Sequence, residues 1–294
     1  MKRILPAPIS RPDSPSSLGR QNAMLSIHSL PCPKRPRSLL VGLALFLLSV
    51  SVQAAGTLEE AAPRTFDDGR RTLKCFPVNI LRGASGVFAP ESLRPLLAGS
   101  ALAGTGVLLD DEVKSAIADE DDALADFAGD YMGPAELGVV TLGLFIGGRF
   151  SEDPRFRAMT YDLAVSASVN LGYTSALKAA INRERPDGSD EDSFPSGHTS
   201  NAFALASVAS AHYGKKVGIP AYVVASAIGV SRLRSNDHWL SDTLGGATLG
   251  TLVGWTVVRQ NDKLTQDETS LNKSVSVMPI LGPGFQGLQV EMTF

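Results

Sequence analysis

Apolar residues dominate the middle of this chain and recur in long stretches that short polar segments interrupt. Between positions 93 and 259 these stretches are rich in Ala, Leu, Val and Gly, a pattern that predicts helices packed against one another. The second predicted helix carries acidic side chains on one face, so we expect it at the surface. The predicted helices are Leu93–Leu109, Glu112–Met132, Ala135–Phe150, Arg155–Asn182, Thr199–Tyr213, Val217–Arg232 and Trp239–Arg259. The expected fold is all-α, a compact bundle of about six core helices.

The regions on either side of the bundle differ from it in composition. Residues 55–93 lack clear periodicity and contain several Gly and Pro, which predicts a loop-rich lead-in. In the tail, apolar and polar residues alternate over Leu288–Phe294, the period of a strand, and Ser274–Ile280 is the expected partner. The predicted regions are 1–54, the lead-in 55–93, the helical domain 94–259 and the tail 260–294, whose short β-hairpin caps the domain.

The first 54 residues have the pattern of a secretory signal peptide. Ser38–Thr57 is an uncharged run of 20 residues that follows three basic residues and contains the small-residue exit Val52-Gln53-Ala54. The alternative is an uncleaved membrane anchor, because a run of this length just spans a bilayer. We expect an exported protein of the periplasm or cell envelope.

Run length also bears on whether the bundle lies in water or in lipid. Within the predicted helices after the signal segment, no uncharged run exceeds 16 residues, whereas a membrane-spanning helix needs about 20. This favours a tightly packed helical domain in water. The six apolar segments leave an integral inner-membrane protein as the alternative.

The distribution of charge excludes one class of partner. The 294 residues include 27 Lys and Arg and 30 Asp and Glu. Seven of the basic residues and one acidic residue precede position 55, so the remainder carries 20 positive and 29 negative charges, a net charge of −9. A body this acidic is a poor match for nucleic acid. Its one remaining thiol, Cys75, cannot form an internal disulfide.

The first group of candidate residues is Lys178-Ala-Ala-Ile-Asn-Arg-Glu-Arg185-Pro186. Lys178 and Arg185 are two helical turns apart, so both cations leave the same face of a helix that ends at Pro186. The planar fork of Arg and the point charge of Lys together suit a phosphate group. A solvated basic helix end is the simpler interpretation of this cluster, and of Arg183 in particular.

The second group is Ser193-Phe-Pro-Ser196-Gly197-His198-Thr199, which directly precedes an apolar helix. Free N–H groups at a helix N-terminus bind anions. Ser196 adds a hydroxyl donor, Gly197 lets the backbone approach closely, and His198 can transfer a proton. An N-cap role would explain Ser196 or Thr199 alone, but it does not explain a neighbouring His198.

The third group is Ser231-Arg232-Leu-Arg-Ser-Asn-Asp-His238-Trp-Leu-Ser-Asp242. His238 and Asp242 are four residues apart, so on a helix the carboxylate can orient the imidazole and make its other nitrogen more nucleophilic. Arg232 ends an apolar run, where a cation needs an anionic partner. The alternative is a structural His–Asp pair. His212, at another helix end, is expected to be structural.

Lys-x6-Arg-Pro, Pro-Ser-Gly-His and Ser-Arg-x5-His-x3-Asp follow one another in this order between Lys178 and Asp242. Three complete motifs in order resemble the tripartite signature of the type 2 phosphatidic acid phosphatase (PAP2) superfamily. That superfamily includes lipid phosphate phosphatases, bacterial non-specific acid phosphatases and vanadium haloperoxidases.

The resemblance implies a phosphatase that needs neither a metal nor another cofactor. It implies that His238 attacks phosphorus and becomes a phosphohistidine, that Asp242 orients it, and that His198 protonates the leaving oxygen and then activates water. The residues that it implies for holding the phosphate oxygens are Lys178, Arg185, Ser196, Gly197 and Arg232.

The resemblance also implies the class of substrate. We expect phosphate monoesters, including lipid phosphates or isoprenoid pyrophosphates, and an association with the membrane; it implies no oligomeric state. The alternatives are a vanadate-dependent haloperoxidase, with vanadate held by His238, and a non-catalytic envelope binding module. The acidic loop Asp187–Asp192 is expected to be solvated, although it could screen against highly anionic substrates or bind a cation.

Overall fold

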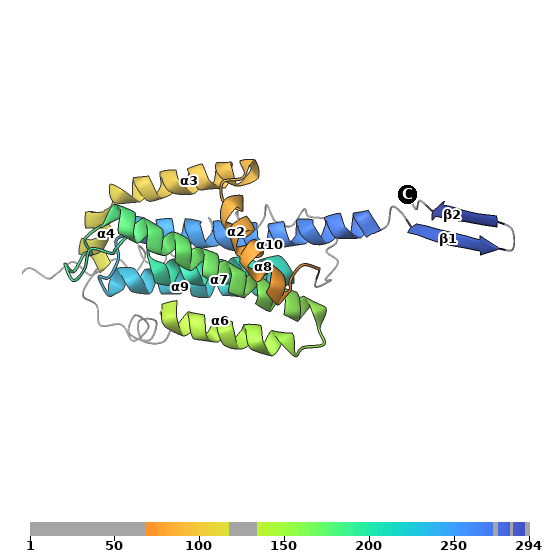
Figure 1. The fold of residues 1–294 in the computed structure, drawn as a ribbon. Coiled ribbons are helices and arrows are strands. Elements are labelled where there is room, and N and C mark those ends of the chain that lie inside the picture. Colours follow the sequence, from red (N-terminus) through yellow and green to blue (C-terminus); the bar gives the residue numbers. More distant parts are fainter. Residues whose placement is uncertain (1–68, 118–133, 273–275, 283–284, 292–294) are drawn as a thin grey trace, which may run out of the picture. The chain divides into compact units, whose positions relative to one another are not determined.

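The computed structural model describes residues 69–117, 134–272, 276–282 and 285–291, which all belong to one compact unit of the chain, Arg35–Phe294 (Figure 1). The predicted signal segment and the first part of the lead-in lie outside the described residues. The helices are η1 (Leu73–Cys75), α2 (Phe76–Gly86), α3 (Pro90–Val107), α4 (Asp110–Ile117), α6 (Pro134–Arg149), α7 (Pro154–Ile181), α8 (Gly197–Tyr213), α9 (Lys215–Arg234) and α10 (Leu240–Asn272). The prediction of an all-α domain is confirmed.

Residues at the helix ends explain where several helices begin and stop. Pro90, Pro134 and Pro154 are the first residues of α3, α6 and α7, where the missing N–H of proline costs nothing. The Asp153 carboxylate caps α7 by accepting the N–H of Arg155 at 2.8 Å. Asn182 ends α7 in the left-handed conformation, with φ of 47°, which asparagine tolerates better than most residues.

The lead-in is more helical than its glycines suggest, so the loop-rich prediction is wrong for residues 73–86. There the chain forms η1 and α2. A Cβ on Gly83 would lie 2.7 Å from Val257 Cγ2, and one on Gly86 would lie 2.3 Å from Thr256 Cγ2. These glycines therefore let α2 approach α10 closely, and they do not break the helix.

Two helix ends also differ from the prediction. α10 continues to Asn272 and does not stop at Arg259, because polar residues after that point find partners. Asn261, for example, is buried and donates to Asp162 of α7 at 2.6 Å. α4 covers only the start of the predicted helix Glu112–Met132, and the rest of that prediction lies outside the described residues.

The centre of the bundle is the contact between α8 and α10. Gly246, Gly250 and Gly254 form a stripe on one face of α10, and a Cβ on each would lie 2.6, 2.1 and 2.6 Å from a carbonyl oxygen of α8. Those carbonyls belong, in the same order, to Ser196, Ser200 and Ala204. Each advance of four residues along α10 is matched by an advance of four residues along α8. The two helices therefore run parallel with their backbones in contact. Their N-termini therefore lie together.

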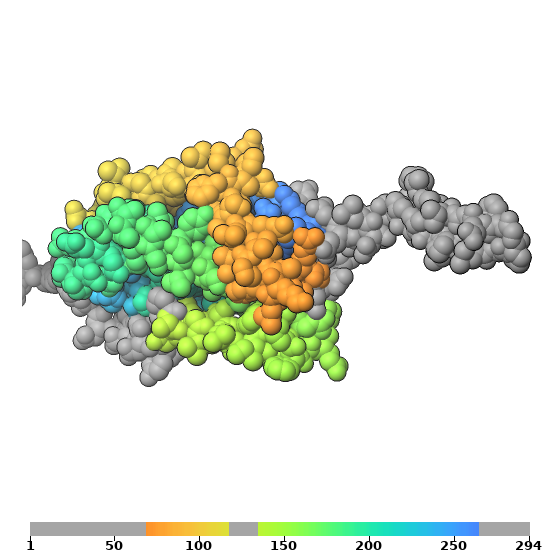
Figure 2. Space-filling view, in the orientation of Figure 1, coloured from red at the N-terminus to blue at the C-terminus, as the bar shows by residue number. Residues whose placement is uncertain are grey.

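The other helices surround this pair. α7 and α9 pack against α8, α2 and α3 pack against α10, and α6 packs against α7. On one face of the molecule α2 and α7 lie side by side, with α3 along one edge and α6 along the other (Figure 2). One apolar cluster joins α7 and α10 with the end of α2 and consists of Val87, Tyr161, Val165, Val169, Leu249, Val253 and Val257.

A buried polar network ties the start of the described chain to this core. Asp162 is fully buried and accepts hydrogen bonds from Arg71 Nη2 at 3.0 Å and from Asn261 at 2.6 Å, and it pairs with His212 Nε2 at 2.8 Å. Arg71 also donates to Asp262 at 2.7 Å. Buried charges of opposite sign that are held together in this way are costly to separate. His212 belongs to this network, at the end of α8 opposite His198.

The tail after α10 forms two paired strands. After α10, β1 (Ser276–Gly282) and β2 (Phe285–Glu291) pair antiparallel, with Val277 opposite Val290. The capping role expected for this tail stays a prediction.

Among the described helices, none is by itself both long and apolar enough to cross a bilayer, and the bent pair α3 and α4 meets that test only when combined.

Candidate active site

Four helix ends bring the three sequence motifs together. Lys178 lies in the last turn of α7, Arg232 in the last turn of α9, and His198 and Asp242 in the first turns of α8 and α10. The parallel packing of α8 and α10 sets their N-termini side by side, and the N–H of Ser196 donates to the Asp242 carbonyl at 3.0 Å. The site therefore forms where the loop between α7 and α8 meets the loop between α9 and α10.

The two cations of the first motif share one anionic partner. Arg185 donates from Nε and Nη2 to Asp192 Oδ1, at 3.0 and 2.6 Å. Lys178 Nζ lies 3.4 Å from the other carboxylate oxygen of Asp192 and donates to its carbonyl. Burial lowers the pKa of Lys178. For Arg185 burial acts in the same direction, but the hydrogen bond and charge of Asp192 outweigh it and raise the pKa.

The second motif forms the N-terminus of α8 as the sequence predicts. Ser196 is buried and is the N-cap, and its Oγ accepts from Thr199 N at 3.5 Å and from Thr199 Oγ1 at 3.0 Å. The capping interpretation of Ser196 therefore applies. Gly197 is the first, buried residue of the helix. Burial and the charge of Arg232 lower the pKa of His198 to about 4, so its imidazole is neutral near pH 7.

The third motif forms a tight turn between α9 and α10. The carbonyl of Arg232 accepts the N–H groups of Asp237 at 3.2 Å and His238 at 3.3 Å, and Asn236 has φ of 60°. The Arg232 side chain is buried and donates from Nη1 to Asp237 Oδ2 at 3.0 Å. This turn holds the His238 backbone against a buried cation.

His238 and Asp242 are neighbours, but the hydrogen bond expected between them is absent. His238 Nδ1 lies 3.9 Å from Asp242 Oδ2, beyond hydrogen-bond distance. The Asp242 carboxylate instead accepts from the Ser193 hydroxyl, from Trp239 N at 2.9 Å and from Arg183 Nη1 at 2.6 Å. Three competing donors explain why the expected pairing is not formed. Burial raises the pKa of Asp242 despite these donors.

His238 is buried within a positive field. Its side chain is 4% exposed, and desolvation together with the charges of Lys178 and Arg185 and the nearby His198 holds its pKa well below the usual 6.5. The imidazole is therefore neutral near pH 7, with an unprotonated nitrogen. Lys178, Arg185 and His198 are thus close enough to His238 to shift its pKa, and Arg232 is close enough to His198 to do the same there. These five residues form one cluster.

Arg183 connects two buried carboxylates. The sequence had suggested only a solvated basic helix end for this residue. Its Nη1 donates to Asp242, as above, and its Nη2 donates to Asp110 Oδ2 at 2.7 Å. Asp110 also accepts the backbone N–H of Ser241 at 2.9 Å and its hydroxyl at 2.7 Å. Sequence reasoning missed Asp110, because it lies 131 residues before Ser241 and outside all three motifs.

Helix α4 makes two further contacts with the motifs. Lys114 Nζ donates to the Pro186 carbonyl at 2.6 Å and lies 5.2 Å from the centroid of the Trp239 ring. Trp239 Nε1 in turn donates to the Glu184 carbonyl at 2.9 Å. α4 therefore touches both the first and the third motif.

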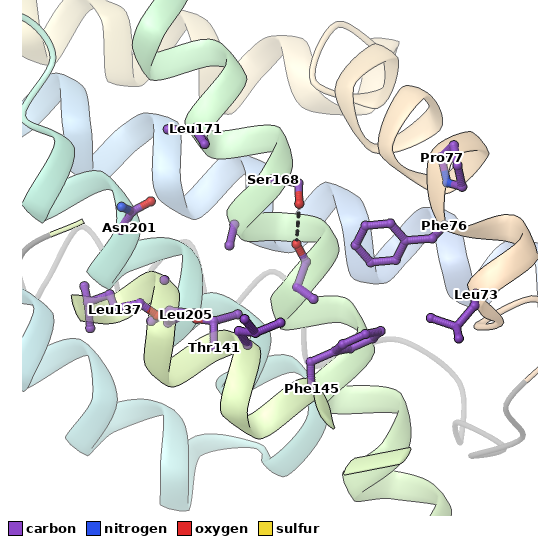
Figure 3. A pocket seen from close by; sticks show the side chains of 14 residues that line it. Leu73, Phe76, Pro77, Leu137, Thr141, Phe145, Ser168, Leu171, Asn201 and Leu205 are labelled. Carbon is purple, nitrogen blue, oxygen red and sulfur yellow. Dashed lines mark hydrogen bonds between the residues drawn. The ribbon is translucent and has the colours of Figure 1, made fainter. Parts of the chain in front are cut away.

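An apolar groove runs along the same side of α8 as His198. Asn201 and Leu205, three and seven residues after His198, line a cavity of about 550 Å³ together with apolar residues of α2, α6 and α7 (Figure 3). Thr141 and Phe145 of α6 face Ser168 of α7 across it. Within the described ranges no group of three or more His, Cys, Asp and Glu side chains could hold a metal ion, and the metal-independent mechanism stays a prediction.

The segment that carries these motifs is similar in sequence to known proteins. Residues 159–266 match the family model of the PAP2 superfamily. A lipid A 1-phosphatase of Porphyromonas gingivalis is 41% identical over 112 residues, which are 37% of this chain and 25% of that protein. The phosphatidylglycerophosphatase B of Bacillus subtilis is 34% identical over 103 residues, which are 30% of this chain and 51% of that protein. The chain thus spans about a quarter and about half of the lengths of these relatives.

One solved structure shows a weaker likeness. A crystal structure of a transmembrane PAP2 type phosphatidylglycerolphosphate phosphatase from Bacillus subtilis is 20% identical, and the alignment covers 75% of this chain and 96% of that chain. The TM-score is 0.35.

Proposed function

Residues 159–266 match the PAP2 superfamily model, and from this premise we propose that the protein is a phosphatase that hydrolyses lipid phosphates. The observation that carries the proposal is the convergence of three cations and two neutral histidines at the adjacent N-termini of α8 and α10. Both curated relatives are named as phosphatases of phosphorylated lipids.

In the first step a neutral nitrogen of His238 attacks phosphorus and the P–O bond to the alcohol breaks. The low pKa of His238 supports this role, because the unprotonated ring is the nucleophile. The negative charge of the bound phosphate lets His198 take up a proton from solvent, and this imidazolium gives the proton to the leaving alkoxide, so that a phosphohistidine remains. Lys178, Arg185 and Arg232 balance the charge on the equatorial oxygens of the transition state, with help from the Ser196 hydroxyl and the Gly197 amide.

In the second step His198, now neutral, takes a proton from water while the water oxygen attacks the phosphohistidine. The P–N bond breaks, inorganic phosphate leaves, and neutral His238 is restored. The Asp242 carboxylate lies 3.9 Å from the imidazole, close enough to stabilise the positive charge that the ring carries as phosphohistidine. A shift of the side chain by about 1 Å would bring the pair within hydrogen-bond distance.

The apolar groove supports a lipid rather than a small soluble substrate. Because Asn201 and Leu205 share a helix face with His198, a hydrocarbon chain in the groove can lie along α8 while its phosphate reaches the cations. Isoprenoid pyrophosphates have the same combination of a long apolar chain and a terminal phosphate. The proposed location is the cell envelope, where such substrates occur.

The proposal is tested by phosphate release and by trapping of the intermediate. Wild type is expected to release phosphate from p-nitrophenyl phosphate and from a phosphatidic acid dispersed in detergent, and brief reaction with a labelled substrate should give an acid-labile phosphoprotein. His238→Ala should lose both. Lys216→Ala, exposed near the opposite end of α9 from Arg232, serves as the control and should keep both. Labelling that persists in His238→Ala would remove this residue as the nucleophile.

A further inference from the structure

The acidic loop between the first two motifs places one of its carboxylates directly on the anion site. Asp192 is the shared partner of Arg185, at 3.0 and 2.6 Å, and of Lys178, at 3.4 Å. These are two of the three cations to which the proposed function assigns the substrate phosphate. The Asp192 side chain is exposed, as expected for this loop, and it also pairs with both cations, which the sequence did not predict.

The backbone of the loop fixes this position independently of the ion pairs. The N–H of Arg185 donates to the Asp190 carbonyl at 2.9 Å, and the N–H of Ser193 donates to the Arg183 carbonyl at 2.9 Å. The Ser193 hydroxyl is anchored on Asp242. With Asp190 and Ser193 held on either side of it, Asp192 leaves the cations mainly by rotation of its side chain.

The contacts of Asp192 are those that a phosphate oxygen would make. Arg185 presents two N–H groups of its fork to a single carboxylate oxygen, and Lys178 approaches the other oxygen. The Asp192 side chain is 41% exposed, compared with 20% for Lys178 and 24% for Arg185. It therefore lies on the solvent side of the cations, where an incoming anion arrives.

We propose that Asp192 is a resident competitor for the phosphate site, which substrate must displace from Lys178 and Arg185 before it can bind fully. This inference rests on the proposed function and deepens it. A monoanion gains little by replacing another monoanion on the same two cations. A dianionic phosphate gains one additional unit of charge, so the exchange favours phosphate over singly charged anions and also limits how tightly the product is retained.

The test compares Asp192→Asn with Glu191→Gln in the full-length protein. Both variants remove one negative charge from adjacent positions, but Glu191 is exposed and is not a partner of either cation in the described contacts. For each protein the dissociation constant of inorganic phosphate is measured by calorimetry, and the KM and kcat for p-nitrophenyl phosphate are measured with phosphate as inhibitor. Thermal unfolding shows whether each variant is folded.

In Asp192→Asn the dissociation and inhibition constants of phosphate should fall about tenfold, equivalent to about 1.4 kcal/mol, and KM should fall with them. kcat should stay near the wild-type value, and Glu191→Gln should behave as wild type. Asp192→Ser removes the carboxylate and keeps only the backbone carbonyl contact to Lys178. It should shift the constants in the same direction and serves if the asparagine variant does not fold.

Weaker phosphate binding in Asp192→Asn, or constants equal to those of Glu191→Gln, overturns the inference, since Asp192 would then hold the cations in place or have no influence on them. If phosphate binds more tightly to Asp192→Asn but neither protein hydrolyses the ester, Asp192 competes for the phosphate site and the proposed phosphatase activity is wrong. A wild type that neither binds phosphate nor hydrolyses the ester would contradict both.

Discussion

His198 and His238 lie in one positive field, yet they differ in how they can respond to substrate. His238 is 4% exposed, and its pKa is depressed so far that it stays neutral in the free protein. His198 is partly exposed, and burial with the charge of Arg232 lowers its pKa to about 4. A general acid with this pKa carries no proton near pH 7 until something changes its surroundings.

Bound phosphate supplies that change, because its negative charge offsets the cations and stabilises the imidazolium form of His198. The pKa of His198 should therefore rise on binding, by about one unit or more. The pH at which kcat falls on the alkaline side reports the pKa of His198 in the complex. The pH at which kcat/KM falls reports its pKa in the free protein. We expect kcat to fall at a higher pH than kcat/KM. Both are measured from pH 4 to 9 and corrected for ionisation of the substrate. Coincident falls, or a fall unaltered in His198→Ala, would argue against this role.

At the scale of the helices, the parallel contact between α8 and α10 accounts for the meeting of the second and third motifs. Gly250→Ala should disturb it most, because the new Cβ would lie 2.1 Å from the Ser200 carbonyl oxygen and 2.9 Å from the Ala204 nitrogen. We expect a loss of about 1–3 kcal/mol in the free energy of unfolding, the usual cost of overpacking, together with reduced activity. Urea unfolding followed by circular dichroism measures the first.

Gly172→Ala in α7 is the matched control for this substitution. Nothing lies within 4 Å of a Cβ at Gly172, which is exposed within a helix. Alanine should leave the stability unchanged or raise it by about 0.5–1 kcal/mol. Equal losses in the two variants would mean that the glycine stripe does not bring the helices together.

Helix α4 lies outside the matched segment and still reaches the candidate site, through Asp110 and Arg183. Asp110→Ala should free the Arg183 guanidinium from one of its two carboxylates and so disturb the charge beside Asp242. We expect kcat to fall about tenfold, as a loss of about 1.4 kcal/mol in transition-state stabilisation would produce, with KM little changed.

Asp111→Ala provides the comparison, because Asp111 is an exposed acidic residue of the same helix. It should retain wild-type kcat, and Asp110→Glu should recover part of the loss. If Asp110→Ala lowers only the thermal unfolding temperature and leaves kcat intact, the contact between α4 and Arg183 stabilises the fold without positioning the site.

For the molecule as a whole, the distribution of apolar surface favours contact with lipid. Large apolar side chains are exposed on several helices, among them Leu97, Val107, Val139, Val140, Leu142, Ile146, Val217, Ile219, Val223 and Val224. Exposed apolar side chains in this number on α3, α6 and α9 favour contact with a membrane or a partner. The buried network around Asp162 and the apolar cores keep the bundle together independently of this surface.

We therefore expect the full-length protein to sediment with membranes and to stay there after a carbonate wash, and to dissolve in detergent. The measurement is immunoblotting of the washed pellet and supernatant, with a peripheral and an integral membrane protein as markers. Release by carbonate would mean that the exposed faces of α3, α6 and α9 do not embed in lipid.

Local signals in the sequence were sufficient for most helices and for the motif residues. The runs that became α3, α7, α8 and α9 were predicted within a few residues, because helix periodicity and capping act over a few turns. The motifs also predicted that Lys178, Arg185, His198 and His238 come close together. The expected reason was wrong for Arg185: α7 ends at Ile181, so Arg185 lies in the following loop and not on the same helix face as Lys178.

The tertiary structure decided what depends on partners distant in the chain. Glycines that suggest a loop in residues 73–86 are instead sites of helix contact, because what a missing Cβ permits depends on the facing helix. Arg183 connects Asp242 to Asp110, and Asp242 accepts other donors in place of His238. Asp192, expected to be solvated, lies on two cations. Spacing along a helix determines which face a side chain leaves, whereas its partner depends on which charges and donors the fold brings within about 3 Å.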